Sequence, residues 1–287
     1  MEKRTVKYLV KIYSYSKQNI WKLWIYDTVR IIYECIEPLL LGLAIDGLMK
    51  KQYISLMCFA GVFLTNIIIA YFNDVQDDIV YNEIKHKFKT DYFSTAVRQN
   101  TDTGIIDADT ELIEEPINFV RCLAVNMGNI VCMIFTPLLY MCFKIDIWLG
   151  LFSLLGCCAF TIVGVIFNKK ELPTIEQIFK LNERRRDKIG SRDVKAYSLF
   201  LRKRHKLIVE NSRVDARGNI WVNLILMLIM VLSLLMLSNK VDITLGSLYA
   251  GIEYIAMLIS GFSIIPDVHY DYKVTEICVN RIDNEEL

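Results

Sequence analysis

Six long apolar segments restrict this sequence to a small set of folds. They span residues 20–48, 54–72, 119–143, 145–168, 219–238 and 243–266. Each reaches the roughly 20 residues that a helix needs to cross about 30 Å of hydrocarbon. Backbone polar groups find no water there, and the ten-residue alternation of a membrane β-barrel is not visible. The segments therefore predict an all-α membrane protein with six transmembrane helices in a single domain.

The connections between the segments alternate between short and long. Short turns join the first to the second segment, the third to the fourth near Lys144, and the fifth to the sixth near Asn239-Lys240. By contrast, residues 73–118 and 169–218 are long and charged. The two long connections and the two termini together hold 27 of the 33 Lys and Arg residues. The positive-inside rule then predicts an integral protein of the plasma membrane with both termini and both long connections in the cytoplasm.

The two long connections are predicted to be helical and not disordered. Residues 73–118 contain one glycine, Gly104, and residues 174–217 contain one, Gly190. Each connection is expected to be a helix leaving the membrane, a break near its glycine, and a helix running back. An arm of about 20–25 residues reaches roughly 30–35 Å at 1.5 Å per residue. The sequence thus predicts two helical tips held far from the membrane, where they can contact a partner.

Four charged residues interrupt the first segment at helical spacing. Asp27, Arg30, Glu34 and Glu37 are separated by three, four and three residues, which places them on one helix face. Ionised groups in hydrocarbon usually face a bundle interior or a water-filled cavity, so the stripe is a candidate translocation pathway. Alternatively, the charges pair among themselves at the membrane interface. Glu37 is the strongest pathway candidate because it is the deepest of the four and precedes Pro38.

Two further charged residues stand inside predicted spans. Glu253 lies near the middle of the sixth segment, with Tyr249 one helical turn before it. It is expected either to face a cavity or to hydrogen-bond to a neighbouring helix. Arg121 lies near the start of the third segment, and we expect its side chain to snorkel to the lipid headgroups.

Neither a metal site nor a nucleic-acid partner is predicted. The three histidines are scattered, and the eight cysteines form no CxxC pattern. Asp74, Asp77 and Asp78 are expected on the solvated face of an exposed helix. The basic clusters of the second long connection have acidic neighbours and are better explained by solvation or by anionic lipid than by nucleic acid.

Several short patterns resemble the six-helix membrane domain of type I ABC exporters. They are Glu37-Pro38-Leu39 followed by Ile45-Asp46-Gly47, the turn Thr244-Leu245-Gly246-Ser247-Leu248, the loop sequences Thr103-Gly104-Ile105-Ile106 and Ile189–Tyr197, and Val279-Asn280-Arg281-Ile282. Their order and spacing extend the resemblance over nearly the whole chain.

The resemblance implies specific partners. In that family two cytoplasmic coupling helices dock onto ATP-binding domains, and two six-helix halves enclose the pathway. The matching coupling-tip residues here are Thr103, Gly104, Ile105, Gly190, Arg192, Val194 and Tyr197. The resemblance therefore implies the lipid bilayer, a second six-helix subunit (a copy or a relative) and an ATP-binding protein as partners.

The sequence departs from the family in one respect. It contains no G-x-x-x-x-G-K-[ST] phosphate-binding motif, and it ends about twenty residues after the sixth segment. We therefore expect the chain not to be an enzyme and to bind no cofactor directly, with ATP bound by a partner subunit.

Two alternatives to a transport subunit stay open. One is an accessory or regulatory membrane protein on the same scaffold, which would bind a partner through its tips without moving cargo. The other is an ion-driven secondary transporter or channel, for which the charged first span is the remaining feature. The inverted repeat expected of many such transporters is not visible.

Overall fold

In the computed structural model every regular element among the described residues, 2–101, 103–183, 193–238 and 243–282, is a helix. These elements are α1 (Glu2–Ser14), α2 (Lys17–Met49), α3 (Ile54–Arg98), α4 (Thr103–Leu112), α5 (Glu114–Tyr140), the π-helical turn η1 (Met141–Ile145), α6 (Ile147–Glu183), α8 (Val194–Ser238) and α9 (Leu245–Arg281). The predicted all-α fold class is confirmed.

Five helical stretches in the described part of the chain are long and apolar enough to cross a membrane. They are α3, the stretch Asp109–Ile145 around α5, α6, α8 and α9. The 33-residue helix α2 falls outside this group, because its more apolar half carries Glu34, Glu37 and Asp46. Five of the six predicted spans are thus supported by composition, and the membrane crossing of α2 stays a prediction.

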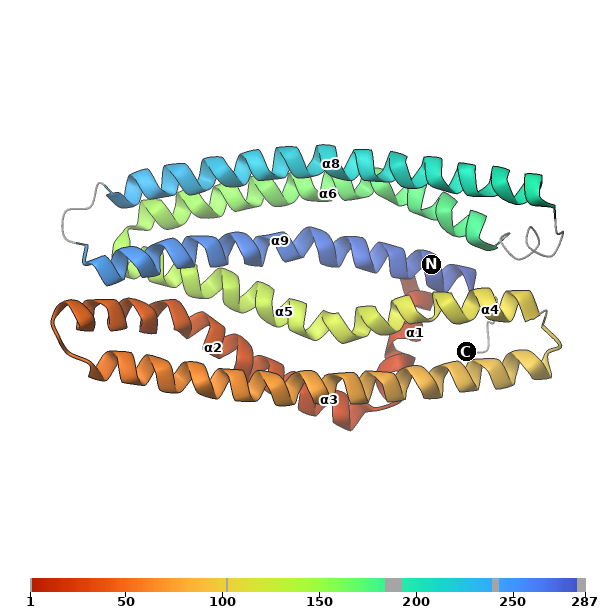
Figure 1. Cartoon of the computed structure of the whole chain (residues 1–287), viewed down its shortest axis with the longest axis horizontal. Helices are drawn as coiled ribbons and strands as arrows, with labels where there is room; N and C mark the ends of the chain where they lie inside the picture. The colour runs from red at the N-terminus through yellow and green to blue at the C-terminus, as the bar shows by residue number, and fades with distance from the viewer. Residues whose placement is uncertain (1, 102, 184–192, 239–242, 283–287) are drawn as a thin grey trace.

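The long helices lie side by side as three pairs, α2 with α3, α5 with α9, and α6 with α8 (Figure 1). Helix α9 is central, since it also packs against α2 and α6. We call the end of the bundle that holds the C-termini of α3 and α6 and the N-termini of α4 and α8 the tip end. The opposite end, where α2 turns into α3 and α9 begins, is the turn end.

Helices α3 and α8 continue far beyond their predicted spans. Each has 45 residues, which corresponds to about 65–70 Å at 1.5 Å per residue. The hydrocarbon layer accounts for only about 30 Å of this length. The continuous helical arms predicted from the long connections are present, and both lead to the tip end (Figure 1).

The break expected near Gly104 is present, four residues before the glycine itself. Gly104 lies inside α4, and the chain reverses at Asn100, whose φ is 53°. The Thr101 amide donates to the Ala96 carbonyl at 3.0 Å, which closes the C-terminus of α3. Asparagine tolerates the left-handed conformation that such a helix end requires. The second expected break, at Gly190, lies outside the described residues.

The third and fourth predicted spans do not meet at a simple turn. Lys144 lies within η1, which widens the last turn of α5. Asp146 is extended, and its carboxylate accepts a hydrogen bond from the Trp148 amide at 2.9 Å, so it caps α6. The fourth helix therefore begins two residues later than predicted, at Ile147. The turn expected at Asn239-Lys240 lies outside the described residues.

Helix α1 packs against α5 and α9 on the tip side of the bundle, and its polar contacts reach α3 and the residue that follows α9. The Tyr15 hydroxyl donates to Asp91 of α3 at 2.6 Å, and Arg4 donates to the Ile282 carbonyl after α9 at 2.8 Å. Burial and the Asp91 hydrogen bond raise the pKa of Tyr15 to about 12. The phenol therefore keeps its proton, and its hydrogen bond, throughout the physiological pH range.

Neighbouring helices supply hydrogen-bond donors beside two of the prolines that lie inside helices. Pro266 of α9 packs against Gly164 of α6, where an added Cβ would lie 2.9 Å from the proline ring. Pro266 has no N–H for the Phe262 carbonyl one turn earlier, and the Thr161 hydroxyl of α6 donates to that carbonyl at 3.4 Å. The Asn168 side chain of α6 also donates to the Pro266 carbonyl at 2.9 Å. Near Pro38 of α2, the Tyr254 hydroxyl of α9 donates to the Cys35 carbonyl at 3.0 Å. Backbone groups in hydrocarbon need such partners, because no water replaces them.

At the turn end, α2 and α9 are in direct backbone contact, which we call the α2–α9 clasp. A Cβ on Gly42 would lie 2.6 Å from the Gly246 carbonyl oxygen, and one on Gly246 would lie 2.0 Å from the Gly42 carbonyl oxygen. The Asp46 carboxylate accepts from the Gly246 amide at 2.8 Å and from the Thr244 hydroxyl at 2.7 Å. The carboxylate of α2 thus caps the N-terminus of α9, where negative charge is favoured.

We predict that Gly246→Ala lowers the free energy of unfolding by about 1–3 kcal/mol, the usual cost of overpacking. The added methyl group would meet backbone, which cannot rotate away, so α2 and α9 must move apart. Thermal unfolding of the purified protein in detergent would measure the change. The matched control is Gly61→Ala in α3, where an added Cβ meets nothing within 4 Å. Equal unfolding temperatures for the two variants would contradict the prediction.

Candidate functional site

Charged side chains of α2, α3 and α5 meet on the tip side of the predicted spans. We call this group the arginine network. Its members are Asp27, Arg30 and Glu34 of α2, Asn73, Asp74, Asp77 and Asp78 of α3, and Arg121 of α5.

The first part of the arginine network joins α2 to α3. Arg30 donates to Glu34, one helical turn along α2, at 3.0 Å and to Asp74 of α3 at 3.3 Å. Asn73 donates to Asp27 at 2.6 Å. Three of the four residues of the predicted stripe are therefore engaged in pairing at the α2–α3 contact.

The second part of the arginine network joins α3 to α5 through Arg121. Its guanidinium donates to Asp77 at 2.5 Å and to Asp78 at 2.6 Å. It also lies over the ring of Tyr81, with the guanidinium carbon 5.9 Å from the ring centroid. The sequence analysis did not anticipate that two carboxylates of a neighbouring helix bind Arg121, and the expected reach of its side chain to the headgroups stays a prediction. The aspartates assigned to a solvated face are its partners.

The arginine network contains five carboxylates and two guanidinium groups; four of the carboxylates accept from a guanidinium, and Asp27 accepts from Asn73. The surplus of acidic groups makes this level of the bundle electronegative, and partial exposure lets water screen the excess. Within the described residues, no group of three or more His, Cys, Asp or Glu is arranged to hold a metal ion. The arrangement therefore suits reversible pairing between helices.

Glu37 stands apart from the arginine network. It lies one turn deeper on α2, between α3 and α9, and borders a cavity of about 10 Å³ together with Asn66. Its carboxylate is close enough to Glu253 of α9 for the two to interact electrostatically. Tyr249 interacts with Glu253 in turn. The structure thus brings together two acidic residues that the sequence analysis selected separately, from the first and sixth predicted spans.

The coupling-tip candidates that the structure describes, from both long connections, lie at the same end of the bundle (Figure 1). Thr103, Gly104 and Ile105 form the first turn of α4. Val194 begins α8 and has 81% of its surface exposed. The ring of Tyr197, one turn further along, stacks on Phe200 with centroids 5.9 Å apart. The remaining candidates, Gly190 and Arg192, lie outside the described residues.

The N-terminus of α8 is capped at this tip. The Asp193 carboxylate accepts from the backbone amides of Lys195 at 2.8 Å and Ala196 at 3.2 Å. A capped helix start holds the exposed Val194 in a defined position.

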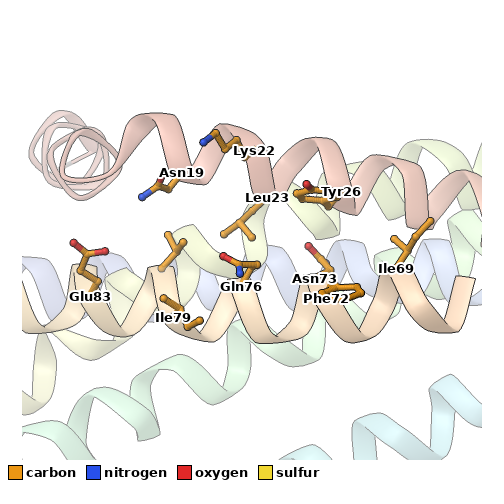
Figure 2. Close-up of a pocket in the computed structure, with 11 residues that line it drawn as sticks. Asn19, Lys22, Leu23, Tyr26, Ile69, Phe72, Asn73, Gln76, Ile79 and Glu83 are labelled. Atoms are coloured by element: carbon orange, nitrogen blue, oxygen red, sulfur yellow. The ribbon is translucent and has the colours of Figure 1, made fainter.

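Two grooves flank α2 at the level of the arginine network, and the sequence analysis anticipated neither. One, of about 530 Å³, lies between α2 and α3 (Figure 2). The other, of about 580 Å³, lies between α2 and α5 and is bordered by Trp21 and Trp24. The sequence analysis also missed Asn73, since a single asparagine after an apolar segment carries no signal of its partner.

Comparison with known proteins gives one match. Residues 9–246 match the model of a protein family described as the ABC transporter transmembrane region. No curated protein matches the chain.

We predict that the contact between Arg121 and Asp77 contributes about 1 kcal/mol of coupling free energy, within the range found for contacting residues. Arg121→Gln, Asp77→Asn and the double variant form the cycle, with unfolding in detergent as the measurement. Replacing Arg121 alone leaves its two carboxylates unpaired, so the double variant should recover part of the loss. Strictly additive changes would contradict the contact.

A second cycle with Asp78→Asn provides the control. The Asp78 side chain is 65% exposed, against 23% for Asp77. Solvent-exposed ion pairs contribute little, so the coupling of Arg121 to Asp78 should be the smaller.

Proposed function

Because this chain belongs to the family of ABC transporter transmembrane regions and is a membrane subunit of an ABC-type transporter, we propose that it forms half of an export pathway. Its tips dock onto ATP-binding domains carried by another polypeptide, whose nucleotide-driven movement reaches the pathway through the helical arms. The tips and both termini lie in the cytoplasm, and the membrane is the plasma membrane.

The observation that carries this proposal is the length and direction of the helical arms. Continuous helices α3 and α8, with 45 residues each, join the predicted spans to one common end. A continuous helix transmits displacement along its axis, and closing motions of packed helices are a known mode of coupling. The 287 residues contain no phosphate-binding G-x-x-x-x-G-K-[ST] motif. In this proposal the energy source is the partner on the tips.

A second six-helix subunit is part of the proposal. In the most apolar stretch of α3, 0% of residues are buried within the chain, and in that of α5 the share is 6%. Along α5 the exposed side chains Met127, Val131, Phe135 and Leu139 recur every four residues, so they share one face. This apolar surface needs lipid, cargo or another subunit to cover it. A symmetric or pseudo-symmetric dimer encloses a pathway that one chain leaves open.

Glu37 and Glu253 are the proposed polar positions of that pathway. They come from α2 and α9, which are in contact along the bundle. Carboxylates at this depth are costly in hydrocarbon, whereas a water-filled cavity solvates them.

We predict that Val194→Asp lowers retention of the ATP-binding partner at least about tenfold, as expected when a charge enters the centre of an apolar contact. The tagged chain would be purified from its own host, and the partner would be detected by photolabelling with azido-ATP. Leu201→Asp is the matched control, because Leu201 is also exposed on α8 but lies two turns from the tip.

Equal loss in the two variants would indicate general damage and contradict docking at the tip. A stable complex that contains no azido-ATP-labelled protein would contradict coupling to an ATPase. That result would favour the accessory or regulatory alternative.

We predict that Glu37→Cys reacts with a membrane-impermeant maleimide in the assembled complex, because a pathway residue contacts water. The background would carry serine at the exposed cysteines Cys58, Cys122 and Cys158. Leu64→Cys, at an exposed apolar position of α3, is the control and should stay unlabelled in lipid. Protection of Glu37→Cys in every nucleotide state would argue against its place in the pathway.

A further inference from the structure

The groove between α2 and α3 has a polar and an apolar part (Figure 2). Its volume is about 530 Å³. The apolar lining is Leu23, Tyr26, Ile69, Phe72, Ile79 and Val80, and the polar lining is Asn19, Lys22, Asn73, Gln76 and Glu83. A site of this composition fits a molecule with a polar head and an apolar tail.

The position of the groove along the bundle matches the headgroup layer of a membrane. The first predicted span begins at residue 20 and the second ends at residue 72. Figure 2 shows Ile69 and Phe72 at one end of the groove and Glu83 at the other. The apolar end therefore lies within hydrocarbon, whereas the polar end lies among headgroups.

Lys22 supplies a positive charge beside this groove. Its side chain is exposed, and among the described residues no carboxylate lies within ion-pair distance of it. Glu83, by contrast, pairs with Lys87 one turn along α3 at 2.5 Å. A lysine at the membrane surface is a point charge suited to a lipid phosphate.

Asn73 supplies a buried acceptor that lacks a partner. The residue is 4% exposed. Its amide nitrogen donates to the Asp27 carboxylate at 2.6 Å, which fixes the orientation of the amide group. The amide oxygen is buried and accepts no hydrogen bond from the described residues. A buried unpaired acceptor is costly, so the site favours a ligand that brings an N–H or O–H donor.

We propose that this groove binds phosphatidylethanolamine. The phosphate pairs with Lys22, the primary ammonium donates to the Asn73 amide oxygen, and an acyl chain lies against Tyr26, Ile69 and Phe72. Phosphatidylcholine has a phosphate but no N–H to donate. Phosphatidylglycerol has hydroxyl donors, but its net negative charge is opposed by the surplus carboxylates of the arginine network.

The test uses the full chain in nanodiscs that contain equal parts of phosphatidylethanolamine, phosphatidylcholine and phosphatidylglycerol. Lipid that stays bound after detergent extraction would be identified by native mass spectrometry. Wild-type protein should retain phosphatidylethanolamine preferentially. Lys22→Gln should lower its retention about tenfold, the effect expected from loss of one hydrogen bond to a charged group. Ile69→Trp, which fills the apolar part of the groove, should lower it as well.

Two controls make the result specific. Lys50→Gln removes an exposed lysine at the other end of α2 and should leave lipid retention unchanged. Mono- and dimethylated phosphatidylethanolamine keep an N–H, so retention should collapse only at the third methylation. Equal retention of the three lipids by wild-type protein would overturn the proposal, as would normal retention by Lys22→Gln. Preferential retention of phosphatidylglycerol would overturn the assignment of the ammonium to Asn73.

Discussion

The backbone contact between α2 and α9 is the constraint on which the arrangement of the bundle depends. Helix α3 packs mainly on α2, so the position of the α2–α3 pair depends on the contacts that α2 makes with α9 and α5. The α2–α9 clasp makes the contact with α9 through two glycines that allow carbonyl and Cα to meet, and through Asp46, which caps α9. In hydrocarbon such close approach of small residues replaces the hydrophobic effect as the source of helix association.

Towards the tip end, a different kind of contact holds the α2–α3 pair. There the arginine network joins α2, α3 and α5 through ion pairs that water can reach. Exposed ion pairs contribute little net stability and exchange partners easily, whereas two backbones in contact have no alternative arrangement. The α2–α3 pair is therefore held by backbone contact at the turn end and by ion pairs at the level of the arginine network. Closer to the tips, Ile84, Phe88 and Tyr92 of α3 are buried in an apolar core shared with α1 and α5.

Hydropathy and spacing predicted most of the helices. Unpaired backbone groups are costly in hydrocarbon, so each span must be a continuous helix of apolar residues, and such a segment is visible in the local sequence. The start of α3 and the end of α8 were predicted to the residue. Contacts between helices were not predictable in this way. Nothing in the local sequence of Arg121 shows that Asp77 and Asp78, more than forty residues earlier, face it. The reversal near Gly104 was predicted, but its exact position at Asn100 was not, because asparagine as well as glycine can adopt that backbone conformation.

The compensated proline of α9 has a mechanical consequence. A proline removes a backbone hydrogen bond, so Pro266 is the place where α9 would be expected to bend. The Thr161 hydroxyl of α6 donates to the Phe262 carbonyl that the proline leaves without its backbone donor. Asn168 binds the Pro266 carbonyl, and Gly164 lets α6 lie directly against the ring. Helix α6 therefore supports α9 at Pro266, where α9 lacks one of its own backbone hydrogen bonds. Helices α6 and α9 are thereby joined at the position where α9 is most easily bent.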